Sequence, residues 1–511
     1  MEIKKILIAN RGEVALRVIR TCREMGIKTV ALCPVKGQEE DFLETQLADE
    51  FYYLEKEGVL GYLDQKRILD IAKKSGADAL HPGYGFLAEN GDFADLCNQN
   101  GIKFIGPSGN IIRSLGDKLE AKRIAKKCGL PILMSTSNAV TNIKDCEKMT
   151  KEIGLPCLLK AVDGGGGIGI EIIDKTNSRN LPAIFEKLQR VATSAFGSGR
   201  IFIEEFLQNP RHIEFQIIGD GRGNVIHLNE RECSIQRRHQ KLIEEAPSPY
   251  LDRWLRGRMG EAAVKLAKFL KYEGVGTVEF LVDQRKRFYF GEVNPRLQVE
   301  HPITEAITGV DLVEQQIRIA QGEKLKLKQW DVRMQGWAME FRICAENVFE
   351  NFKPQSGTIS RYLVPGGRGI EIHSFCQPGQ RIYPFFDSMI SKLIVSGKDR
   401  QSVIKKAIGA LDEYVIEGIH NNIPFHKAVL SKSSFIEGRL STNFIEKEKI
   451  LDRVKEQYQP AKKKKKGRKE VLHNEELAQI LASVYSGMEK NGAKSREENK
   501  WRMTQRYKLF E

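Results

Sequence analysis

The stretch TVEFLVDQRKRFYFGEVNPRLQVEHP, residues 277–302, carries the strongest signal for both fold and chemistry. Thr277–Val282 and Phe288–Val293 are rich in β-branched and aromatic residues and flank a charged turn, which predicts a β-hairpin. A hairpin centred in that turn places Glu279 opposite Glu292. Opposed carboxylates destabilise a sheet unless a cation lies between them, and hard oxygen ligands suit Mg²⁺. The hairpin therefore predicts a metal site.

The second strand of this hairpin continues with strict alternation of polar and apolar residues. Its polar members are Glu292, Asn294, Arg296, Gln298 and Glu300. If the chain stays extended, all five side chains lie on one face, and the proline at position 295 predicts an edge strand or a bulge. An ordinary strand with a solvated polar face is the alternative, but two acids, two amides and a single Arg are an unusual mixture for such a face.

A glycine-rich loop, Gly164–Gly169, lies between the apolar run Cys157–Lys160 and the alternating run Ile170–Ile173. Glycines let backbone N–H groups approach an anion closely. A P-loop would need Gly-Lys-Ser/Thr and a following helix, so this loop is expected to join two strands as a flap over phosphates. A flexible hairpin without a ligand is the alternative. Lys160 and Lys118 are candidate phosphate contacts, with a solvated surface position as the alternative for each.

The first ~110 residues alternate between strand and helix patterns. Strands are expected at Ile3–Ala9, Ile27–Cys33, Ala77–Leu80 and Lys103–Gly106, and helices at Glu13–Met25, Lys66–Ser75 and Phe93–Asn98. This alternation predicts a parallel, doubly wound α/β unit, and the lack of G-x-G-x-x-G argues against a dinucleotide site. Further strands are expected at Gly336–Cys344, Thr358–Leu363, Ile370–His373 and Met389–Val395, with a helix near Gln401–Tyr414.

The composition is that of a globular protein of about three domains, with 511 residues, 41% hydrophobic and 29% charged. About half of the net charge of +14 falls after residue 450, where 16 basic residues face 9 acidic ones. A mildly basic body suits anionic small substrates and does not require nucleic acid. Nine cysteines without C-x-x-C spacing, no long apolar run and no signal-peptide core predict a reduced, cytoplasmic protein without a membrane span.

A second polar cluster, Gln236–Lys241, is followed by the acidic pair Glu244-Glu245. It fits a basic nucleic-acid patch or a phosphate or bicarbonate site. The absence of interleaved aromatic residues for base stacking weighs against nucleic acid. Cys233 nearby is expected to be a packed thiol, since nothing in the sequence indicates a depressed pKa.

Together these motifs resemble the biotin carboxylase family of ATP-grasp ligases, over about residues 1–446. The stretches that carry the resemblance are Ile8–Glu13, His81–Leu87, Arg231–Pro247, Glu292–Pro302 and Phe386–Ile390. The resemblance implies an α/β and α+β fold in three parts. These are a Rossmann-like N-terminal domain (1–115), an ATP-grasp domain (116–325) with a mobile lid at about 133–204, and a mixed C-terminal domain (330–446). A basic linker and short helix would fill 452–511.

The resemblance also implies a role for each matched position. Arg296, Glu300, Lys241 and Arg342 would be catalytic, with Glu300 the general base and Arg342 holding the biotin ureido oxygen. Glu279, Glu292 and Asn294 would bind Mg²⁺ or Mn²⁺, two ions being expected. The cofactor-binding residues would be Lys118, Lys160, Gly165, Gly166, Gly167, Glu204, Glu205, Phe206, Leu207, His212, Gln236 and His239 for ATP, Gln298 and Val299 for bicarbonate, and Tyr84 beside biotin.

The family's reaction uses ATP and bicarbonate to carboxylate biotin on a carrier protein. A carboxylate base helps bicarbonate attack the γ-phosphate, and the labile carboxyphosphate product requires a lid that excludes water. Its breakdown gives CO₂ and a phosphate that can deprotonate biotin. Arg342 would then stabilise the resulting enolate, while metal and lysines neutralise the phosphoryl group.

The glycine loop departs from the family pattern at three positions. Asp163 stands where the family has a small residue or Gly, Ile168 where it has Arg or Lys, and Ile170 where it often has Met. An added anion and a missing cation near phosphates predict a weaker closed lid and a higher KM for ATP.

The resemblance implies partners in trans as well. No biotin-attachment segment or carboxyltransferase region is recognised, so a separate biotin carboxyl carrier protein and carboxyltransferase are expected, with a homodimer as the family's usual state and the acyl acceptor left open. The run Lys462–Lys466 and a helix at Glu475–Met488 either dock a partner or form a solubilising tail. The alternatives are another ATP-grasp carboxylate or bicarbonate ligase, such as a carbamoyl-phosphate type, and a nucleic-acid or scaffold protein that binds through the basic tail.

Overall fold

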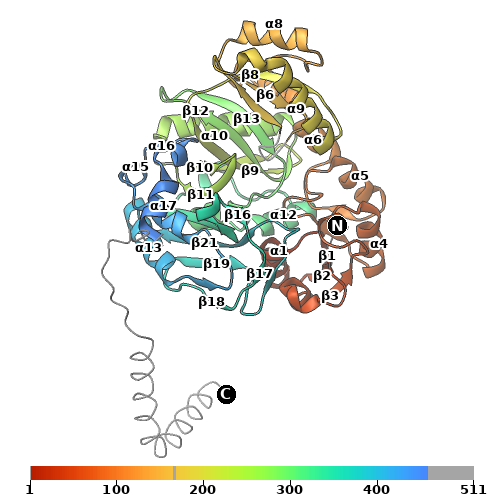
Figure 1. Cartoon of the computed structure of the whole chain (residues 1–511). Coiled ribbons are helices and arrows are strands. Elements are labelled where there is room, and N and C mark those ends of the chain that lie inside the picture. The colour runs from red at the N-terminus through yellow and green to blue at the C-terminus, as the bar shows by residue number, and fades with distance from the viewer. Residues whose placement is uncertain (1, 165–168, 459–511) are drawn as a thin grey trace, which may run out of the picture. The chain divides into compact units, whose positions relative to one another are not determined.

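A five-stranded parallel sheet forms the N-terminal part of the protein (Figure 1). The computed structural model describes residues 2–164 and 169–458. The strands are β1 (Lys5–Ile8), β2 (Lys28–Cys33), β3 (Glu50–Tyr53), β4 (Ala79–His81) and β5 (Lys103–Phe104), in the order β3-β2-β1-β4-β5. The helices between them are α1 (Gly12–Glu24), α2 (Leu43–Leu47), α3 (Val59–Tyr62), α4 (Gln65–Ser75) and α5 (Gly91–Gln99).

Helices cover both faces of this sheet, because successive residues of β1 belong to different cores. Ile6 and Ile8 pack in one buried cluster with α1, whereas Leu7 packs in another with α4 and α5. The doubly wound α/β unit predicted from the alternating pattern is confirmed, and the ends of the predicted elements differ from the observed ends by at most two residues.

An eight-stranded sheet spans the rest of the molecule in the order β13-β12-β9-β10-β11-β14-β21-β19. Its strands are β9 (Arg211–Asp220), β10 (Val225–Arg237), β11 (Gln240–Ala246), β12 (Glu273–Val282), β13 (Phe288–Asn294), β14 (Trp337–Cys344), β19 (Ile370–Ser374) and β21 (Met389–Gly397), all paired antiparallel. β11 lies before the domain boundary expected at residues 325–330, and β14 lies after it. Because these two strands pair, one continuous sheet contains strands from both sides of that boundary. The limits expected for the three domains stay a prediction.

Further helices pack on the large sheet or on one another. They are α6 (Gly109–Gly116), α7 (Lys118–Lys127), α10 (Arg253–Phe269), α11 (His301–Thr308), α12 (Leu312–Ala320), α13 (Arg400–Glu413), α14 (Ile423–Leu430), α15 (Ser433–Ile436), α16 (Phe444–Lys447) and α17 (Ile450–Tyr458). Helix α10 lies against β9 and β10, α11 against β14 and its neighbours, and α13 against β14 and β21.

The glycine loop belongs to a small unit with its own sheet and core. Strands β7 (Ile170–Ile173) and β8 (Ile201–Glu205) both pair antiparallel with β6 (Cys157–Ala161), and α8 (Ile143–Ile153) and α9 (Leu181–Phe196) pack there. Figure 1 shows these elements together at one end of the fold. The expectation that the loop joins two strands is confirmed. Gly165, Gly166 and Gly167 lie outside the described residues, as does Ile168.

The strand expected at Thr358–Leu363 is wrong as a single element. It divides into β17 (Gly357–Thr358) and β18 (Arg361–Leu363), which pair with β20 (Arg381–Ile382) and β22 (Val415–Glu417) respectively. A further short pair joins β15 (Glu346–Asn347) to β16 (Lys353–Pro354). Two partners in different places require the chain to turn between Thr358 and Arg361. The helix expected at Glu475–Met488 lies outside the described residues.

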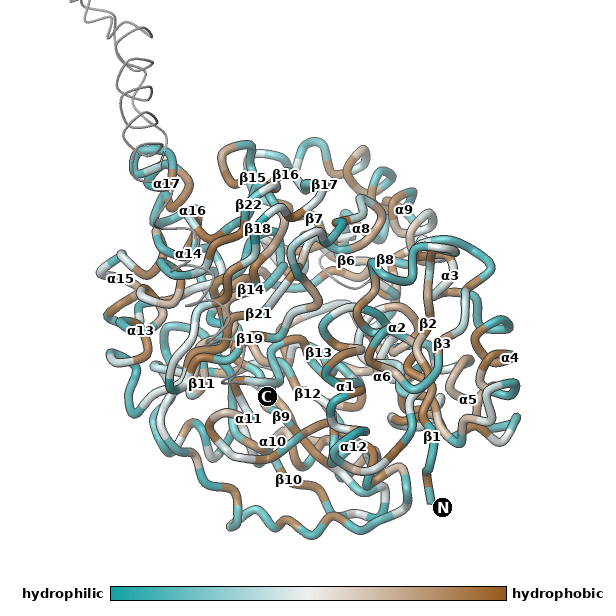
Figure 2. Tube along the Cα trace, turned by 90° about the horizontal axis from the view of Figure 1, so that it is seen from below, coloured by the Kyte–Doolittle hydropathy of each residue, from teal (hydrophilic) through white to brown (hydrophobic). Residues whose placement is uncertain are grey.

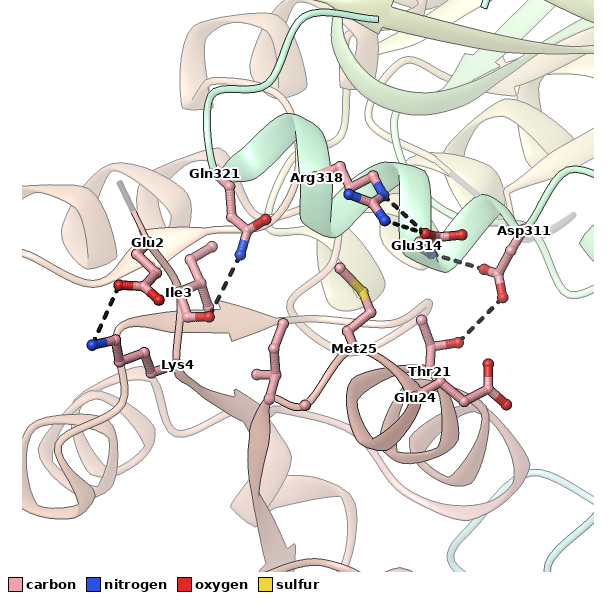
Figure 3. A pocket seen from close by; sticks show the side chains of 12 residues that line it. Glu2, Ile3, Lys4, Thr21, Glu24, Met25, Asp311, Glu314, Arg318 and Gln321 are labelled. Carbon is pink, nitrogen blue, oxygen red and sulfur yellow. Dashed lines mark hydrogen bonds and ion pairs between the residues drawn. The ribbon is translucent and has the colours of Figure 1, made fainter. Parts of the chain in front are cut away.

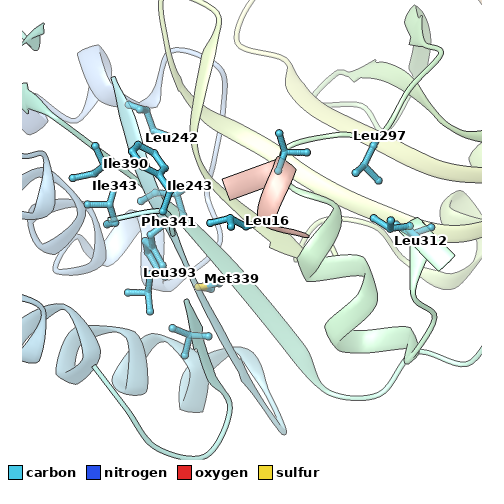
Figure 4. Close-up of a cluster of buried hydrophobic side chains, with 14 of the residues drawn as sticks. Leu16, Leu242, Ile243, Leu297, Leu312, Met339, Phe341, Ile343, Ile390 and Leu393 are labelled. Carbon is cyan, nitrogen blue, oxygen red and sulfur yellow. The ribbon is translucent and has the colours of Figure 1, made fainter. Parts of the chain in front are cut away.

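The largest hydrophobic core lies along the strands of the central sheet. Figure 4 shows side chains of β11 and β14, among them Ile243, Met339, Phe341 and Ile343, packed with Leu16 of α1 nearby. In Figure 2 the hydrophobic colour follows β14 and β21 through the interior. Within residues 2–164 and 169–458, no helix is both long and apolar enough to cross a membrane.

Candidate active site

The predicted hairpin forms, but its register is broken next to the metal-ligand candidate. Thr277 pairs with Asn294, as a turn centred between residues 285 and 286 requires, and Phe280 then pairs with Phe290. Between them the bulge sets two residues of β13, Gly291 and Glu292, against the single Glu279 of β12, so the expected one-to-one pairing of Glu279 with Glu292 is wrong. The extra residue re-aims the two carboxylates, which contact different lysines.

Lys241 on β11 lies at the centre of a buried acidic group. Its Nζ lies 2.7 Å from Glu300 Oε1 and 3.0 Å from Glu279 Oε1, and it also contacts Glu214. Glu214 is completely buried on β9, where Arg231 of β10 and Glu279 of β12 are its cross-strand neighbours. The carboxylates around this ammonium group therefore come from two adjacent strands, β9 and β12, and from Glu300 at the start of α11.

Mutual attraction keeps Lys241 and Glu300 ionised despite their burial. Burial alone would lower the pKa of Lys241, but the surrounding carboxylates raise it well above its ordinary value. Burial also opposes ionisation of Glu300, yet Lys241 and Arg342 hold its pKa well below the usual range. The pKa of Glu300 thus depends on whether the side chains of Lys241 and Arg342 contact its carboxylate.

Arg342 on β14 joins Glu300 to a second acid. Its Nη2 donates to Glu300 Oε2 at 2.9 Å, and its Nε donates to Glu244 Oε1 at 2.7 Å. Arg296 donates to Gln298 Oε1 and to Asn294 Oδ1, each at 3.3 Å, and pairs with Glu89. The structure therefore brings the four predicted catalytic residues into one connected network.

The alternating pattern places its five polar side chains on one face only if the chain stays extended after β13. The structure shows that it does not. β13 ends at Asn294, and residues 295–300 form an irregular turn that leads into α11. Arg296 nevertheless bonds to the polar side chains on either side of it in the stripe. Gln298 is buried, and its Nε2 has no hydrogen-bond partner in the described part of the chain. A buried free amide donor of this kind fits an anionic ligand.

Val299 and Tyr84 meet at a second lysine, Lys392 on β21. Lys392 Nζ donates to the Val299 carbonyl oxygen at 2.8 Å and pairs with Glu13 at 3.0 Å. Tyr84 donates to Glu13, and its ring lies 6.0 Å from the same ammonium group. These contacts place Tyr84 at the edge of the network near Glu300.

The predicted phosphate contacts lie on three different elements. Lys118, the first residue of α7, pairs with Glu292 at 2.9 Å, whereas Lys160 on β6 contacts Glu204 together with Lys122. Lys160 and Glu204 lie on paired strands of the small sheet, and Glu205, Phe206 and Leu207 continue from β8 into the connection to β9. The lid and the large sheet thus each carry part of the predicted nucleotide site.

His239 occupies the tip of the β10–β11 hairpin. Arg238 and His239 both have positive φ, 50° and 66°, in a two-residue turn that usually requires Gly or Asn. Burial, then Lys160 and His212, lower the pKa of His239. A non-glycine turn held in this conformation, close to two other predicted nucleotide contacts, is typical of a functional position.

The metal-ligand candidates fit a hard divalent cation in their chemistry. Asn294 Nδ2 donates to Glu279 Oε1 at 2.8 Å, and His212 Nε2 lies 2.9 Å from Glu279 Oε2. Gln236 lies beyond His212, with 3.4 Å between its Nε2 and the His212 Nδ1. Glu292 points to Lys118 instead. Two carboxylates and an amide on neighbouring strands are a donor set that Mg²⁺ binds.

Sequence reasoning missed Glu214, Glu244 and Arg231, although all three are completely buried in the site. A signal was present for Glu214, because residues 212–217 alternate His-Ile-Glu-Phe-Gln-Ile, and only the first polar member was selected. The partners of Glu244 and Arg231 lie on strands whose pairing the sequence does not reveal.

A separate pocket opens beside α12 and contains none of these residues. Its walls come from residues 2–4, the end of α1 and α12, with Glu24, Asp311, Glu314 and Arg318 among its lining side chains (Figure 3).

Three family models match the chain in succession along its length. They are the biotin carboxylase N-terminal domain over residues 2–112, the ATP-binding domain of the carbamoyl-phosphate synthase L chain over 117–328, and the biotin carboxylase C-terminal domain over 340–447. Biotin carboxylase 1 of Bacillus subtilis is 47% identical over 446 residues, which are 87% of this chain and 98% of that protein. The chain belongs to the biotin carboxylase family.

Other relatives are named for different carboxylases. A pyruvate carboxylase subunit of Methanothermobacter thermautotrophicus is 50% identical over 86% of this chain and 89% of that protein. The biotin carboxylase domain dimer of Hydrogenobacter thermophilus 2-oxoglutarate carboxylase, solved with MgADP, ADP and bicarbonate, matches with a TM-score of 0.86 and 44% identity over 88% of this chain and 99% of that one. The fold and family expected from the motifs are confirmed.

Proposed function

We propose that this chain uses ATP and bicarbonate to carboxylate biotin that a separate carrier protein presents. One observation carries the proposal: Glu300 lies between Lys241 and Arg342, and two residues before it the buried Gln298 has an amide nitrogen without a hydrogen-bond partner among the described residues. Lys241, Arg296 and Gln298 would bind bicarbonate, and Arg342 would meet the biotin ureido oxygen. A carbamoyl-phosphate-type ligase needs a phosphate loop and a metal pair, but not this set together with Arg342.

The basicity of Glu300 would be coupled to substrate entry. While Lys241 and Arg342 both hold the carboxylate, its pKa lies well below the usual range and it is a poor base. Each cation that turns toward an incoming anion removes part of that stabilisation, and the pKa of Glu300 rises. Glu300 would thus accept the bicarbonate proton only when substrates have drawn its partners away.

The remaining residues would hold ATP and its metal. Glu279, Glu292 and Asn294 would bind Mg²⁺ or Mn²⁺, which when bound supplies charge to neutralise the transferring phosphoryl group. Lys118, Lys160, His239 and the loop glycines would contact the phosphates, with Gln236, His212 and residues 204–207 along the nucleotide pocket. We also propose a homodimer and a carboxyltransferase in trans, supported by the dimer solved for the Hydrogenobacter relative.

The experiment that tests this function is ADP release with Mg²⁺-ATP, in the presence and absence of bicarbonate and of free biotin. We expect both additions to raise the rate in the wild type, and Glu300→Gln to lower the stimulated rate by at least about 100-fold, since the base is lost while its shape is kept. Glu417→Gln, a change at an exposed position on β22, is the matched control.

Two results would contradict the proposal. ATP turnover that bicarbonate stimulates and biotin does not would favour a different ATP-grasp ligase. Equal rates in wild type and Glu300→Gln would remove Glu300 from the chemistry. A biotinylated carrier protein used in place of free biotin tests presentation in trans in the same assay.

A further inference from the structure

Glu244 and Glu340 form a carboxyl pair that the mechanism above does not use. They are directly opposed in the antiparallel register of β11 and β14, so both side chains lie on the same face of the sheet. Both residues are completely buried. Opposed carboxylates in the interior repel each other, and the usual resolution is that one of them keeps a proton.

Three of the four carboxyl oxygens of this pair have no hydrogen-bond partner among the described residues. Glu244 Oε1 accepts from Arg342, but Glu244 Oε2 and both oxygens of Glu340 have no hydrogen-bond partner among the described residues. An ionised carboxylate buried without partners is costly, whereas a protonated carboxyl costs far less and can donate a hydrogen bond. The structure therefore favours a neutral Glu340.

The charges that face Glu340 come from four places. They are Glu244 on β11, Arg342 on its own strand β14, Lys392 on β21, and Glu300 at the start of α11. Lys392 is already paired with Glu13 of α1, and Arg342 is shared between Glu244 and Glu300. No cation among these is left for Glu340 alone.

On its other side Glu340 borders an apolar cluster. Ala338 precedes it by two on β14, Ile394 is its cross-strand neighbour on β21, and α11 adds Ile303 and Ile307. Burial is accordingly the largest cause that raises the pKa of Glu340 well above its ordinary value, and burial raises the pKa of Glu244 to about 7. Because the two carboxyls repel each other and both lie in the interior, the form of the pair that carries one proton is favoured over the doubly ionised form.

We propose that Glu244 and Glu340 share one proton. This proton limits the pair to a single negative charge next to Arg342, so that the guanidinium can turn to the biotin ureido oxygen. Glu340 is then a positioning residue for the carboxylation step, and the inference rests on the proposed function. When the shared proton is lost at alkaline pH, two negative charges hold Arg342 back from the substrate. The developing enolate would also face a doubly negative neighbour.

The proton itself is tested by infrared spectroscopy on the full chain without substrates. We expect wild type at pH 7 to show a protonated-carboxyl band that shifts in D₂O and is missing from Glu340→Gln in the difference spectrum. A wild-type spectrum that is identical to that of Glu340→Gln in this region overturns the proposal. This readout does not depend on any enzymatic activity, so it separates failure of the pair from failure of the proposed function.

The positioning role is tested by the pH profile of biotin-dependent ADP release, with bicarbonate-dependent release without biotin as the reference. We expect the alkaline fall in the biotin-dependent rate to move up by about one pH unit or more in Glu340→Gln, because this side chain cannot ionise. Glu340→Met, which suits the adjoining apolar cluster, gives a second neutral variant if Gln prevents folding.

Glu346→Gln is the matched control, since Glu346 is also buried with a raised pKa but bonds to Ser388 instead of facing Arg342. We expect its profile to superimpose on that of the wild type. Superposition of the Glu340→Gln or Glu340→Met profile on the wild type overturns the positioning role. A shift in the biotin-independent reference of the same size also overturns it, because such a shift does not act through Arg342.

Discussion

Glu204 has two lysine partners, one of which ties the small unit of β6, β7 and β8 to α7. It is almost completely buried at the end of β8 and contacts both Lys122 of α7 and Lys160 of β6. Burial disfavours its charge, but Lys160 and Lys122 outweigh that effect and lower the pKa of Glu204 to about 2. Removing one carboxylate would leave two buried ammonium groups facing each other.

We therefore predict that Glu204→Gln lowers the free energy of unfolding by about 3 to 5 kcal/mol at pH 7, the usual cost of breaking a buried pair. Because the folded pKa of Glu204 lies below its ordinary value of 4.5, its contribution is present above that value and is lost as pH falls toward about 2. Urea unfolding of both proteins at several pH values measures the difference.

The control for this prediction lies in the same small sheet. Glu171 pairs with Lys187 at 2.9 Å, but both side chains are substantially exposed, so Glu171→Gln should cost at most about 1 kcal/mol. Equal losses for the two variants, or a loss at Glu204 that stays constant down to pH 3, would contradict the role given to burial.

At the level of single residues, the sequence predicts most of the site and misses the groups behind it. The alternation of polar and apolar residues finds Arg296, Gln298 and Glu300 because it is visible without knowing the fold, although the strand itself ends at Asn294. Glu244 and Glu340 are invisible in this way, since they meet only when β11 pairs with β14. A carboxyl pair that two segments 96 positions apart create has no local pattern.

At the level of elements, the root of the glycine loop is tied to α7 by one arginine. Arg200 directly precedes β8. Its Nη2 lies 3.0 Å from Asp117 Oδ2, and it also pairs with Asp163. Asp117 caps α7, and the Lys118 backbone N–H donates to the Val162 carbonyl. The unusual Asp163 is therefore neutralised within the described residues, which opposes the expected weakening of the lid by this anion.

Removing that arginine should expose the effect of Asp163. We predict that Arg200→Ala raises the KM for ATP by about two- to fivefold, the size expected for a half-exposed ion pair whose loss leaves two carboxylates close to Lys118. Steady-state ADP release at saturating bicarbonate measures it. Adding Asp163→Gly should restore most of the change; a double variant no better than Arg200→Ala would show that the ion pair itself is not the cause.

Elements with one strong period are the ones the sequence predicts well. The helix expected at Glu13–Met25 is found at Gly12–Glu24, where the positive φ of Gly12 disfavours any side chain and the ring of Phe375 lies close to its Cα. The hairpin predicted for 277–294 forms, but its strand register shifts beside Glu279, which the prediction did not include. The bulge lies beside a residue whose partners, His212 and Lys241, come from other strands that the local sequence does not reveal.

At the level of the whole molecule, one sheet joins regions that the motifs assign to different domains. β11 contributes its edge to β14 through four paired positions, and the largest core includes residues of α1, β11, β14 and β21. The lid unit, in contrast, has a core of its own with far fewer members. Burial of backbone hydrogen bonds between β11 and β14 should make these strands open together.

We predict that hydrogen exchange of the whole chain shows β11 and β14 in the same, slowest class, with β6, β7 and β8 exchanging sooner. The reason is that opening the β11–β14 pair requires the central core to separate, whereas the small sheet opens by losing only its own packing. Mass spectrometry of peptic peptides from 240–246 and 337–344, compared with 157–161 and 201–205, measures the two classes. Faster exchange of β14 than of the lid strands would mean that the C-terminal region opens independently, and that the continuous sheet does not unify the two predicted domains. Adding Mg²⁺-ATP should slow exchange in the lid strands toward the central class while leaving β11 and β14 unchanged, because a ligand stabilises only the openings that break its own contacts.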